Sequence, residues 1–335
     1  MAANLAKVHR RLRVGLITNP GSGRNRSGLS KIRRLCADLP GSGYHEARDP
    51  VEIAAALGEL SRFGPDVLAV NGGDGTVQAV LTALFRDRPF DDPPLLALLR
   101  GGTTNMTAGD VGLRGRMPGA LQRLLSLAGS ATAPVQVERR PILKVDGPGE
   151  GQPRYGMFFG AGAIIKGIEY CHAKVHTKGF RDGIAPGICT LRLLLALARK
   201  DRTYASPTPM TLTTSSASGS EMTCAGQQDY YLVLASPLER LFLGLRPYWG
   251  RQQGAFYFSA LRADPVHTLR ALPPLFWGHA GRLATPENGY YSEKIDGLEL
   301  DMDGPYTLDG EIYHASRDNG PVRVTVGGWA SFLRI

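Results

Sequence analysis

A glycine-rich turn between an apolar strand and a helix constrains this chain more than any other feature. Residues 71–76 read N-G-G-D-G-T. The apolar run 66–70 before them predicts a buried strand, and residues 76–85 predict a helix. Units of this kind belong to parallel sheets covered by helices, and such sheets bind ligands at the carboxyl ends of their strands. We therefore expect a binding site at this turn.

The same alternation runs through the first third of the chain. Apolar residues of the second predicted helix recur on one face, at Ile53, Ala56, Leu57 and Leu60. This pattern predicts an α/β domain with a parallel sheet. The remaining predicted strands are 13–18 and 95–99, and the remaining predicted helices are 27–39 and 51–62.

The pattern changes after about residue 135, where strands follow one another with few helices between them. This predicts a mostly β, sandwich-like second domain, and we place the boundary after residue 138, between Pro134 and Pro141. Residues 206–220, rich in Ser and Thr, predict a strand and an exposed loop. The other predicted elements are strands 135–145, 154–159, 230–235 and 255–261 and helices 188–200 and 265–272.

Two further polar loops follow predicted strands. Residues 19–26 read N-P-G-S-G-R-N-R, which allows backbone amides to approach an anion at the start of the next helix. Arg26 stands where a dinucleotide fingerprint needs glycine, and Leu29 stands where a Walker A loop needs lysine. Residues 100–105, R-G-G-T-T-N, offer hydroxyls and amides to a phosphate or ribose. A plain turn in the first loop, and a helix N-cap at Thr103 or Thr104 in the third, remain alternatives.

Asp74 lies among three glycines of the second loop. A carboxylate beside bound phosphates repels them unless it holds Mg²⁺ or accepts a proton. The alternative is a glycine turn that Asp74 caps. Arg24, Arg26 and Lys166 are candidates for balancing phosphate charge, although each can equally be a solvated cation.

The net charge is +9 and the isoelectric point is about 9.5. A basic chain can bind nucleic acid, an anionic membrane surface or phosphate-rich substrates. No aromatic-studded basic strand, helix-turn-helix or zinc motif supports nucleic acid, so we expect none as a partner. The cysteines are far apart, and neither a secretory signal nor a membrane-spanning segment is evident, so we expect a cytoplasmic protein.

Taken in order, N-P-x-S-G, G-G-D-G-T, G-T-x-N and a late L-D-G-E at residues 308–311 resemble the diacylglycerol kinase catalytic family. That family includes bacterial diacylglycerol and phosphatidylglycerol kinases, sphingosine kinases and ceramide kinases. The resemblance implies ATP-dependent transfer of a phosphoryl group to a lipid hydroxyl, with Mg²⁺, in phospholipid or related lipid metabolism. It extends from about Arg13 to Leu333.

The resemblance also implies roles for individual residues. Asp309 is the general base on the lipid hydroxyl and Glu311 a metal ligand or alternative base. Asp74 is a metal ligand, or the base itself, and the sequence does not decide between Asp74 and Asp309. The residues implied to bind the nucleotide are Asn19, Pro20, Gly21, Ser22, Gly23, Gly72, Gly73, Asp74, Gly75, Thr76, Gly102, Thr103, Thr104 and Asn105.

The implied organisation is a nucleotide domain (1–138), a β-rich lipid domain (139–318) and a C-terminal segment (319–335) that returns towards the first domain. The glycine loops and the late acidic pair are expected to meet in one cleft. The resemblance further implies peripheral contact with the inner, anionic membrane face, and it leaves a homodimer open.

The sequence departs from the family at three places. Met106 stands where the family has an aspartate, and Gln78 and Ala79 replace residues after the glycine turn that are usually Asn and Glu. The segment 246–250 replaces an acidic loop, so we expect no structural Mg²⁺ there. A non-catalytic lipid-binding relative is therefore kept as an alternative. An NAD kinase is a second alternative, because that family also uses G-G-D-G-T and a β-rich second domain.

Two weaker patterns lie in the second half of the chain. Cys171, His172 and His176 lie close together but lack an evident fourth ligand, so zinc is not favoured. Apolar and aromatic residues at 241–249, and an amphipathic stretch at 191–200, suit either a core or a lipid-facing edge.

Overall fold

The computed structural model divides the chain into two compact units. Unit 1 comprises Met1–Ile142 and Gly328–Ile335, and unit 2 comprises Leu143–Gly327. The predicted helix 188–200, the amphipathic stretch 191–200 and the cluster of Cys171, His172 and His176 lie outside the described residues. The described residues are 4–7, 11–26, 28–37, 43–130, 134–147, 151–166, 206–216, 222–223, 226–250 and 252–335.

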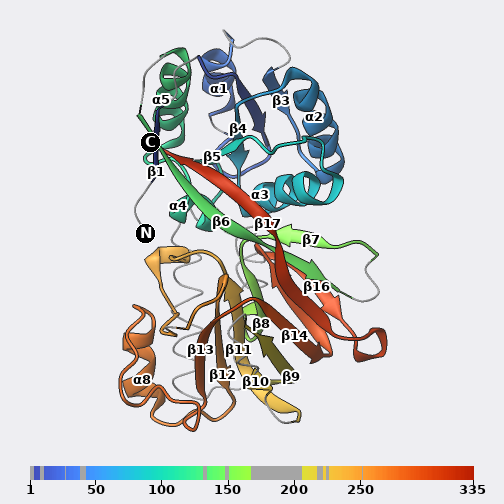
Figure 1. The fold of residues 1–335 in the computed structure, drawn as a ribbon, viewed down its shortest axis with the longest axis vertical. Coiled ribbons are helices and arrows are strands. Elements are labelled where there is room, and N and C mark those ends of the chain that lie inside the picture. Colours follow the sequence, from blue (N-terminus) through green and yellow to red (C-terminus); the bar gives the residue numbers. More distant parts are fainter. Residues whose placement is uncertain are drawn as a thin grey trace. The chain divides into compact units, whose positions relative to one another are not determined.

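Unit 1 contains a parallel sheet with the strand order β3-β2-β4-β5 (Figure 1). β4 is buried along its whole length, because helices cover such a sheet on both faces. β5 pairs in parallel with the end of β17, and β1 pairs antiparallel with β6. The strands are β1 (Asn4–Lys7), β2 (Val14–Thr18), β3 (Tyr44–Glu46), β4 (Val67–Gly72), β5 (Leu95–Arg100), β6 (Pro134–Asp146) and β17 (Val322–Arg334).

The helices of unit 1 begin and end as local chemistry dictates. In α2 the Asp49 carboxylate accepts hydrogen bonds from the backbone N–H groups of Val51 and Glu52, and the left-handed Gly64 ends the helix. The helices are α1 (Leu29–Leu35), α2 (Pro50–Phe63), α3 (Asp74–Thr82), the π-helical turn η2 (Ala83–Asp87), α4 (Met106–Asp110) and α5 (Met117–Gly129).

Every strand and helix predicted for the first third is present, with shifted ends. The most informative shift concerns α3, which begins at Asp74 and not at Thr76. Gly73 is its N-cap residue and has extended backbone angles, so the aspartate lies in the first helical turn. There a carboxylate interacts favourably with the helix dipole.

Unit 2 is built from antiparallel strands, among them the pairs β11–β12, β12–β13 and β9–β14 (Figure 1). Its strands are β7 (Arg154–Gly156), β8 (Phe159–Gly162), β9 (Thr208–Ser215), β10 (Met222–Thr223), β11 (Gln228–Ser236), β12 (Phe256–Arg262), β13 (Tyr290–Ile295), β14 (Gly297–Met302), β15 (Gly304–Leu308) and β16 (Glu311–Ala315). Short helices complete it, namely η3 (Phe242–Gly244), α8 (Thr268–Leu275) and η4 (Arg317–Asn319).

Aromatic side chains fill the interior of unit 2. Phe159, Tyr230, Phe256, Phe258 and Tyr306 are almost fully buried in one apolar cluster. Such side chains suit a pleated surface that is buried on one face. The fold class expected from the sequence, a parallel α/β domain followed by a mostly β domain, is confirmed.

The C-terminal strand β17 contributes to both units. Its first half pairs with β14 in unit 2, where Val324 lies opposite Leu298. Its second half pairs with β5 in unit 1, where Phe332 lies opposite Leu96 and Leu333 is buried in the core. The last residues of the chain therefore belong to the first unit. No helix in the described part of the chain is long and apolar enough to cross a bilayer.

Candidate functional site

Three polar loops follow the adjacent parallel strands β2, β4 and β5 of unit 1. Because β2 pairs with β4 and β4 with β5, the carboxyl ends of the three strands share one edge of the sheet. We call residues 19–26 loop 1, the glycine turn at residues 71–76 loop 2 and residues 101–105 loop 3. This is the edge at which parallel sheets bind their ligands.

Hydrogen bonds join loop 1 to loop 2. The backbone N–H of Asn19 donates to the carbonyl of Asn71 at 2.9 Å, and the Asn19 amide donates to the Thr76 hydroxyl at 3.0 Å. The N–H of Gly73 donates to the Ser22 hydroxyl at 3.3 Å. Residues of two separate sequence motifs therefore hold one another in place.

Loop 3 is attached to loop 1 and folded on itself. The N–H of Arg24 donates to the carbonyl of Gly101 at 2.9 Å. The buried Asn105 side chain accepts from the N–H of Gly102 at 2.8 Å and donates to the Gly102 carbonyl at 2.6 Å. Asn105 takes left-handed backbone angles as it enters α4. Its amide thus shapes the loop, whereas Thr104 is exposed.

Glycine is required where the loops touch. A Cβ at Gly102 would overlap the Cα of Gly73, and a Cβ at Gly23 would lie 2.7 Å from the Thr103 hydroxyl oxygen. Any side chain at these positions would push the loops apart. The sequence thus uses glycine to bring three backbone segments together.

Asp74 links loop 2 to the start of α4. Its Oδ2 accepts a hydrogen bond from the N–H of Met106 and its Oδ1 one from the N–H of Thr107, both at 3.0 Å. α4 has no side-chain cap of its own, so Asp74 satisfies its first N–H groups from a distant part of the sequence. The cap is therefore neither Thr103 nor Thr104.

Burial raises the pKa of Asp74 above its usual value, and the hydrogen bonds from the N–H groups of Met106, Thr107 and Asn105 oppose that rise. Perturbed pKa values are common among carboxylates at functional sites, and structural contacts also produce them. Met106 donates to Asp74 through its backbone, so this contact does not depend on the side chain that replaces the family's aspartate.

Two buried asparagines that were not among the predicted site residues also support the site. The Asn25 amide donates to the carbonyls of Asn19 at 2.8 Å and Asn71 at 3.2 Å. Both Asn25 and Asn71 are fully buried, and a Cβ at Gly101 would collide with their side chains. Asn25 stands two residues after Gly23, so its place in the motif was a signal that could have identified it.

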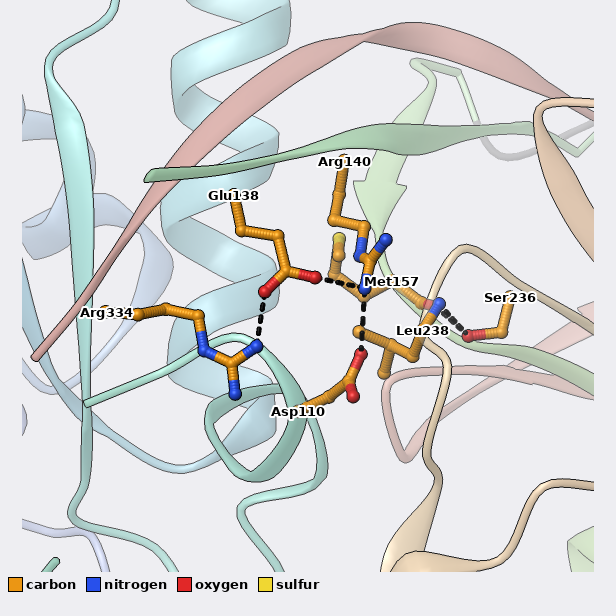
Figure 2. A network of polar contacts seen from close by, with 7 residues as sticks. All are labelled: Asp110, Glu138, Arg140, Met157, Ser236, Leu238 and Arg334. Carbon is orange, nitrogen blue, oxygen red and sulfur yellow. Dashed lines mark hydrogen bonds and ion pairs between the residues drawn. The ribbon is translucent and has the colours of Figure 1, made fainter. Parts of the chain in front are cut away.

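The other end of α4 is held by charged side chains (Figure 2). Arg140 pairs with Asp110 at 4.0 Å and with Glu138, and Glu138 also pairs with Arg334 of β17. Asp110 is buried at a helix C-terminus, where a negative charge is unfavourable unless a cation balances it. The sequence signal was the i, i+2 spacing of Glu138 and Arg140, which places both on one face of a strand.

In unit 2, Asp309 and Gly310 form the two-residue turn between β15 and β16. Both have positive φ, of 51° and 93°, and Leu308 pairs with Glu311 across the turn. This is the geometry for which Asp-Gly is the preferred sequence in a β-hairpin. The D-G of the late motif is therefore explained by backbone geometry as well as by any chemistry.

The Asp309 side chain is buried and directed towards the segment between β7 and β8. Its Oδ2 accepts a hydrogen bond from the N–H of Met157 at 2.9 Å, and a Cβ at Gly156 would overlap the same oxygen. The Met157 carbonyl accepts from the Ser236 hydroxyl at 2.7 Å, and that hydroxyl accepts from the N–H of Leu238 at 3.1 Å (Figure 2). The Met157 backbone, which donates to Asp309, is thus itself fixed by the Ser236 hydroxyl.

The remaining candidate residues divide between the two units. In unit 1, Arg24 is exposed, and the exposed Arg26 donates to the Gly21 carbonyl at 3.1 Å. In unit 2, Glu311 is exposed and Lys166 donates to the Ser206 hydroxyl at 2.7 Å. The predicted site residues of the three loops lie together in unit 1. Asp309 and Glu311 lie at one hairpin of unit 2.

A nucleoside triphosphate fits the loops of unit 1 on chemical grounds. The N-terminus of α3 has no side-chain cap, and three glycine-containing loops meet beside it, which is a favourable environment for phosphate. The described residues contain no group of three or more His, Cys, Asp or Glu side chains suited to a metal. One carboxylate with phosphate oxygens and water is nevertheless a usual coordination for Mg²⁺, so Asp74 fits this role.

Comparison with known proteins adds independent evidence. Residues 13–137 match the family model "Diacylglycerol kinase catalytic domain". A segment of 82 residues is 38% identical to the lipid kinase YegS of Escherichia coli K12, and it covers 24% of this chain and 26% of that protein. The match thus spans about a quarter of the length of the curated relative.

Solved structures are similar over almost the whole chain. A diacylglycerol kinase from Bacillus anthracis str. Sterne matches with a TM-score of 0.57 and 16% identity, covering 98% of this chain and 97% of that one. Another Bacillus anthracis chain matches with a TM-score of 0.61 and 18% identity at the same coverage, 98% and 97%. At these identities the similarity establishes the fold. The loops of unit 1 and these comparisons confirm the resemblance of residues 13–137 to the diacylglycerol kinase catalytic domain.

Proposed function

We propose that this chain is an ATP-dependent kinase that phosphorylates a lipid hydroxyl. The observation that carries the proposal is the joining of three glycine-containing loops around the uncapped start of α3, with Asp74 in its first turn. Phosphoryl transfer depends on positioning and charge neutralisation far more than on covalent chemistry. A rigid set of backbone donors meets that requirement.

Within unit 1, the loops would bind and orient the phosphates. Backbone N–H groups at Asp74, Gly75 and Thr76 would donate to phosphate oxygens, and Asn19 and Ser22 would fix the loops that carry them. The half-buried Thr103 and the exposed Thr104 would contact the rest of the nucleotide. Mg²⁺, when bound through Asp74, supplies neutralisation of the phosphate charge.

Within unit 2, Asp309 would accept the proton of the lipid hydroxyl, and Glu311 would assist it or contact the metal. Its bond to Met157 orients the Asp309 carboxylate, which is what a general base of low intrinsic basicity needs. This part of the proposal requires that Asp309 reach the phosphate bound by unit 1. Asp74 remains the competing candidate for the base.

The acceptor would be a lipid of the diacylglycerol or sphingoid type, since these carry the free hydroxyl that the family phosphorylates. The product would then enter phospholipid or related lipid metabolism. Such an acceptor lies in a membrane, so the protein would act at the anionic cytoplasmic face. Whether it does so as a homodimer is decided by mass measurement in solution.

A kinase assay with labelled ATP tests the proposal. The acceptors are diacylglycerol, monoacylglycerol, phosphatidylglycerol, a sphingoid base and NAD, each with and without Mg²⁺. We expect label in one of the lipids, only with Mg²⁺. Label in NAD alone would instead make the chain an NAD kinase.

The non-catalytic alternative is separated by Asp74→Asn. A kinase loses turnover in this variant while its thermal unfolding stays cooperative. No label in any acceptor with the wild-type chain, combined with lipid binding that Asp74→Asn leaves unchanged, would overturn the proposal in favour of a binding protein.

A further inference from the structure

Large apolar side chains are exposed on one part of unit 2. Among the described residues, six large hydrophobic side chains are exposed, and four of them lie at residues 243–277. Leu269 is 72% exposed, and Leu243 and Trp277 are each 58% exposed. Exposed apolar side chains that cluster in one region mark an interaction surface more often than single ones do.

The apolar core does not require these side chains. In α8, Thr268, Ala271, Leu272 and Leu275 are buried, and the last three pack in an apolar cluster with residues of β11, β12 and β13. Figure 1 shows α8 beside β13. Leu269 and Arg270 occupy the other side of this helix. The inner face of α8 packs against the core of unit 2, so its outer face is available for another contact.

The turn that carries Leu243 is attached to the end of α8. The N–H of Arg246 donates to the carbonyl of Phe276 at 2.7 Å, and the Trp277 N–H continues the helical turn by donating to the Pro274 carbonyl at 3.1 Å. Trp277 lies two residues after the end of α8, and both Arg270 and Trp277 are exposed. We call Leu243, Arg246, Leu269, Arg270 and Trp277 the α8 face.

Its charged side chains, Arg246 and Arg270, are basic. Residues 265–282 also contain Arg282, His267 and His279, and residues 240–250 also contain Arg240; the nearest acidic residues in the sequence, Glu239 and Asp264, lie just outside these two segments. Within the described part of the chain, Arg246 and Arg270 form no ion pair. The guanidinium groups are therefore available to anions outside the molecule.

We propose that the α8 face docks unit 2 on the surface of a bilayer that contains anionic phospholipid. Leucine and tryptophan side chains insert at the boundary between headgroups and acyl chains, while the arginines bind the phosphates of the headgroups. A second copy of the chain is a poor occupant, because two surfaces of the same positive charge would repel. This inference deepens the proposed function, on which it rests for a membrane-borne substrate.

The test is co-sedimentation with vesicles in the absence of ATP. Wild-type protein is mixed with vesicles of phosphatidylcholine alone or of phosphatidylcholine with phosphatidylglycerol. We expect binding to the anionic vesicles that weakens with salt and is much weaker to the neutral ones. Equal binding to both, or to neither, would overturn the proposal.

Variants locate the contact. Leu269→Glu should lower the partition coefficient at least ~10-fold, and Arg270→Gln should lower it about fivefold, the loss expected for one cation at an anionic surface. Val51→Glu is the matched control, because Val51 is 79% exposed in unit 1. It should bind as the wild type does. Equal binding by Leu269→Glu and Val51→Glu, both with wild-type thermal unfolding, would refute the assignment.

Kinase assays distinguish failure of docking from failure of the proposed function. With lipid in detergent micelles, Leu269→Glu should keep wild-type turnover, but with lipid in anionic vesicles its turnover should fall with binding. If the wild-type chain binds vesicles but phosphorylates no lipid, the docking proposal is supported and the proposed kinase function is rejected. Loss of solution self-association in Leu269→Glu, without loss of vesicle binding, would make the α8 face a protein contact and overturn the docking proposal.

Discussion

The surroundings of Asp74 and of Asp309 resemble each other in one respect and differ in another. Each carboxylate accepts hydrogen bonding from the backbone, Asp74 from two N–H groups and Asp309 from that of Met157. Asp74 uses both oxygens to cap a helix at the edge of a parallel sheet. Asp309 occupies a left-handed position in a hairpin turn.

The two positions therefore differ in the physical reason for which an aspartate is present. The position of Asp74 does not demand aspartate for backbone reasons, because a helix N-terminus can be capped in many ways. The position of Asp309 favours Asp or Asn through its backbone angles alone. A D-G pair in a turn is therefore weaker evidence of chemistry than an aspartate held among three glycine-containing loops.

Asp74→Asn is expected to have the largest effect on this comparison. Removing the charge that faces the phosphates should lower kcat at least ~10³-fold, the scale seen when a main electrostatic group is lost. The measurement is phosphorylation of the active lipid over a range of Mg²⁺ concentrations. Asp91→Asn, at an exposed position, is the control and should be indistinguishable from the wild type. Full activity of Asp74→Asn would remove Asp74 from the site.

Asp309→Asn should lower kcat by about 10²- to 10⁴-fold if Asp309 is the base, with no change in the Mg²⁺ dependence. Asn accepts the left-handed conformation, so the variant should remain folded. Asp309→Ala should additionally lose about 1–2 kcal/mol of stability from that conformation. A kcat loss that excess Mg²⁺ reverses would show that Asp309 acts on the metal instead.

Gly102→Ala tests whether the loops of unit 1 must touch. Overlap with the Cα of Gly73 should destabilise the protein by about 1–3 kcal/mol and raise the KM for ATP. Gly109→Ala is the matched control in the next helix, because a Cβ there meets nothing within 4 Å. It should be neutral or stabilise by up to about 1 kcal/mol. Chemical denaturation of both variants measures the difference, and equal values would argue against close contact.

The smallest effect that we predict is on the pH dependence of the unfolding free energy. The pKa of Asp74 is raised in the folded state, so that state binds the proton more tightly than the unfolded chain does. The resulting stabilisation is complete below the unfolded pKa, near 4, and is lost as the pH rises through the folded pKa. The difference in unfolding free energy between wild type and Asp74→Asn should follow this trend in the absence of Mg²⁺. A difference that is constant with pH would contradict it.

The sequence predicted the parts of the site that depend on local chemistry. Apolar runs of strand length, glycine turns and helical periodicity identified β2, β4 and β5 and the loops that follow them, because each signal lies within a few residues. It did not predict that α3 begins at Asp74, that Asn25 joins loops 1 and 2, or that Arg140 balances Asp110. The contacts of Asn25 and Arg140 join residues far apart in the chain, so a local signal can mark these residues as candidates but cannot name their partners.

By itself, then, the sequence determined the alternation of elements, the change from parallel α/β to antiparallel β, and the glycines that allow backbone close to an anion. These follow from side-chain periodicity and from the conformational freedom of single residues. Tertiary structure alone decided which N–H groups Asp74 and Asp309 satisfy, that Arg246 is joined to the end of α8, and that β17 ends in unit 1. These features depend on packing between segments. The energy of each contact depends on residues that are distant in the sequence.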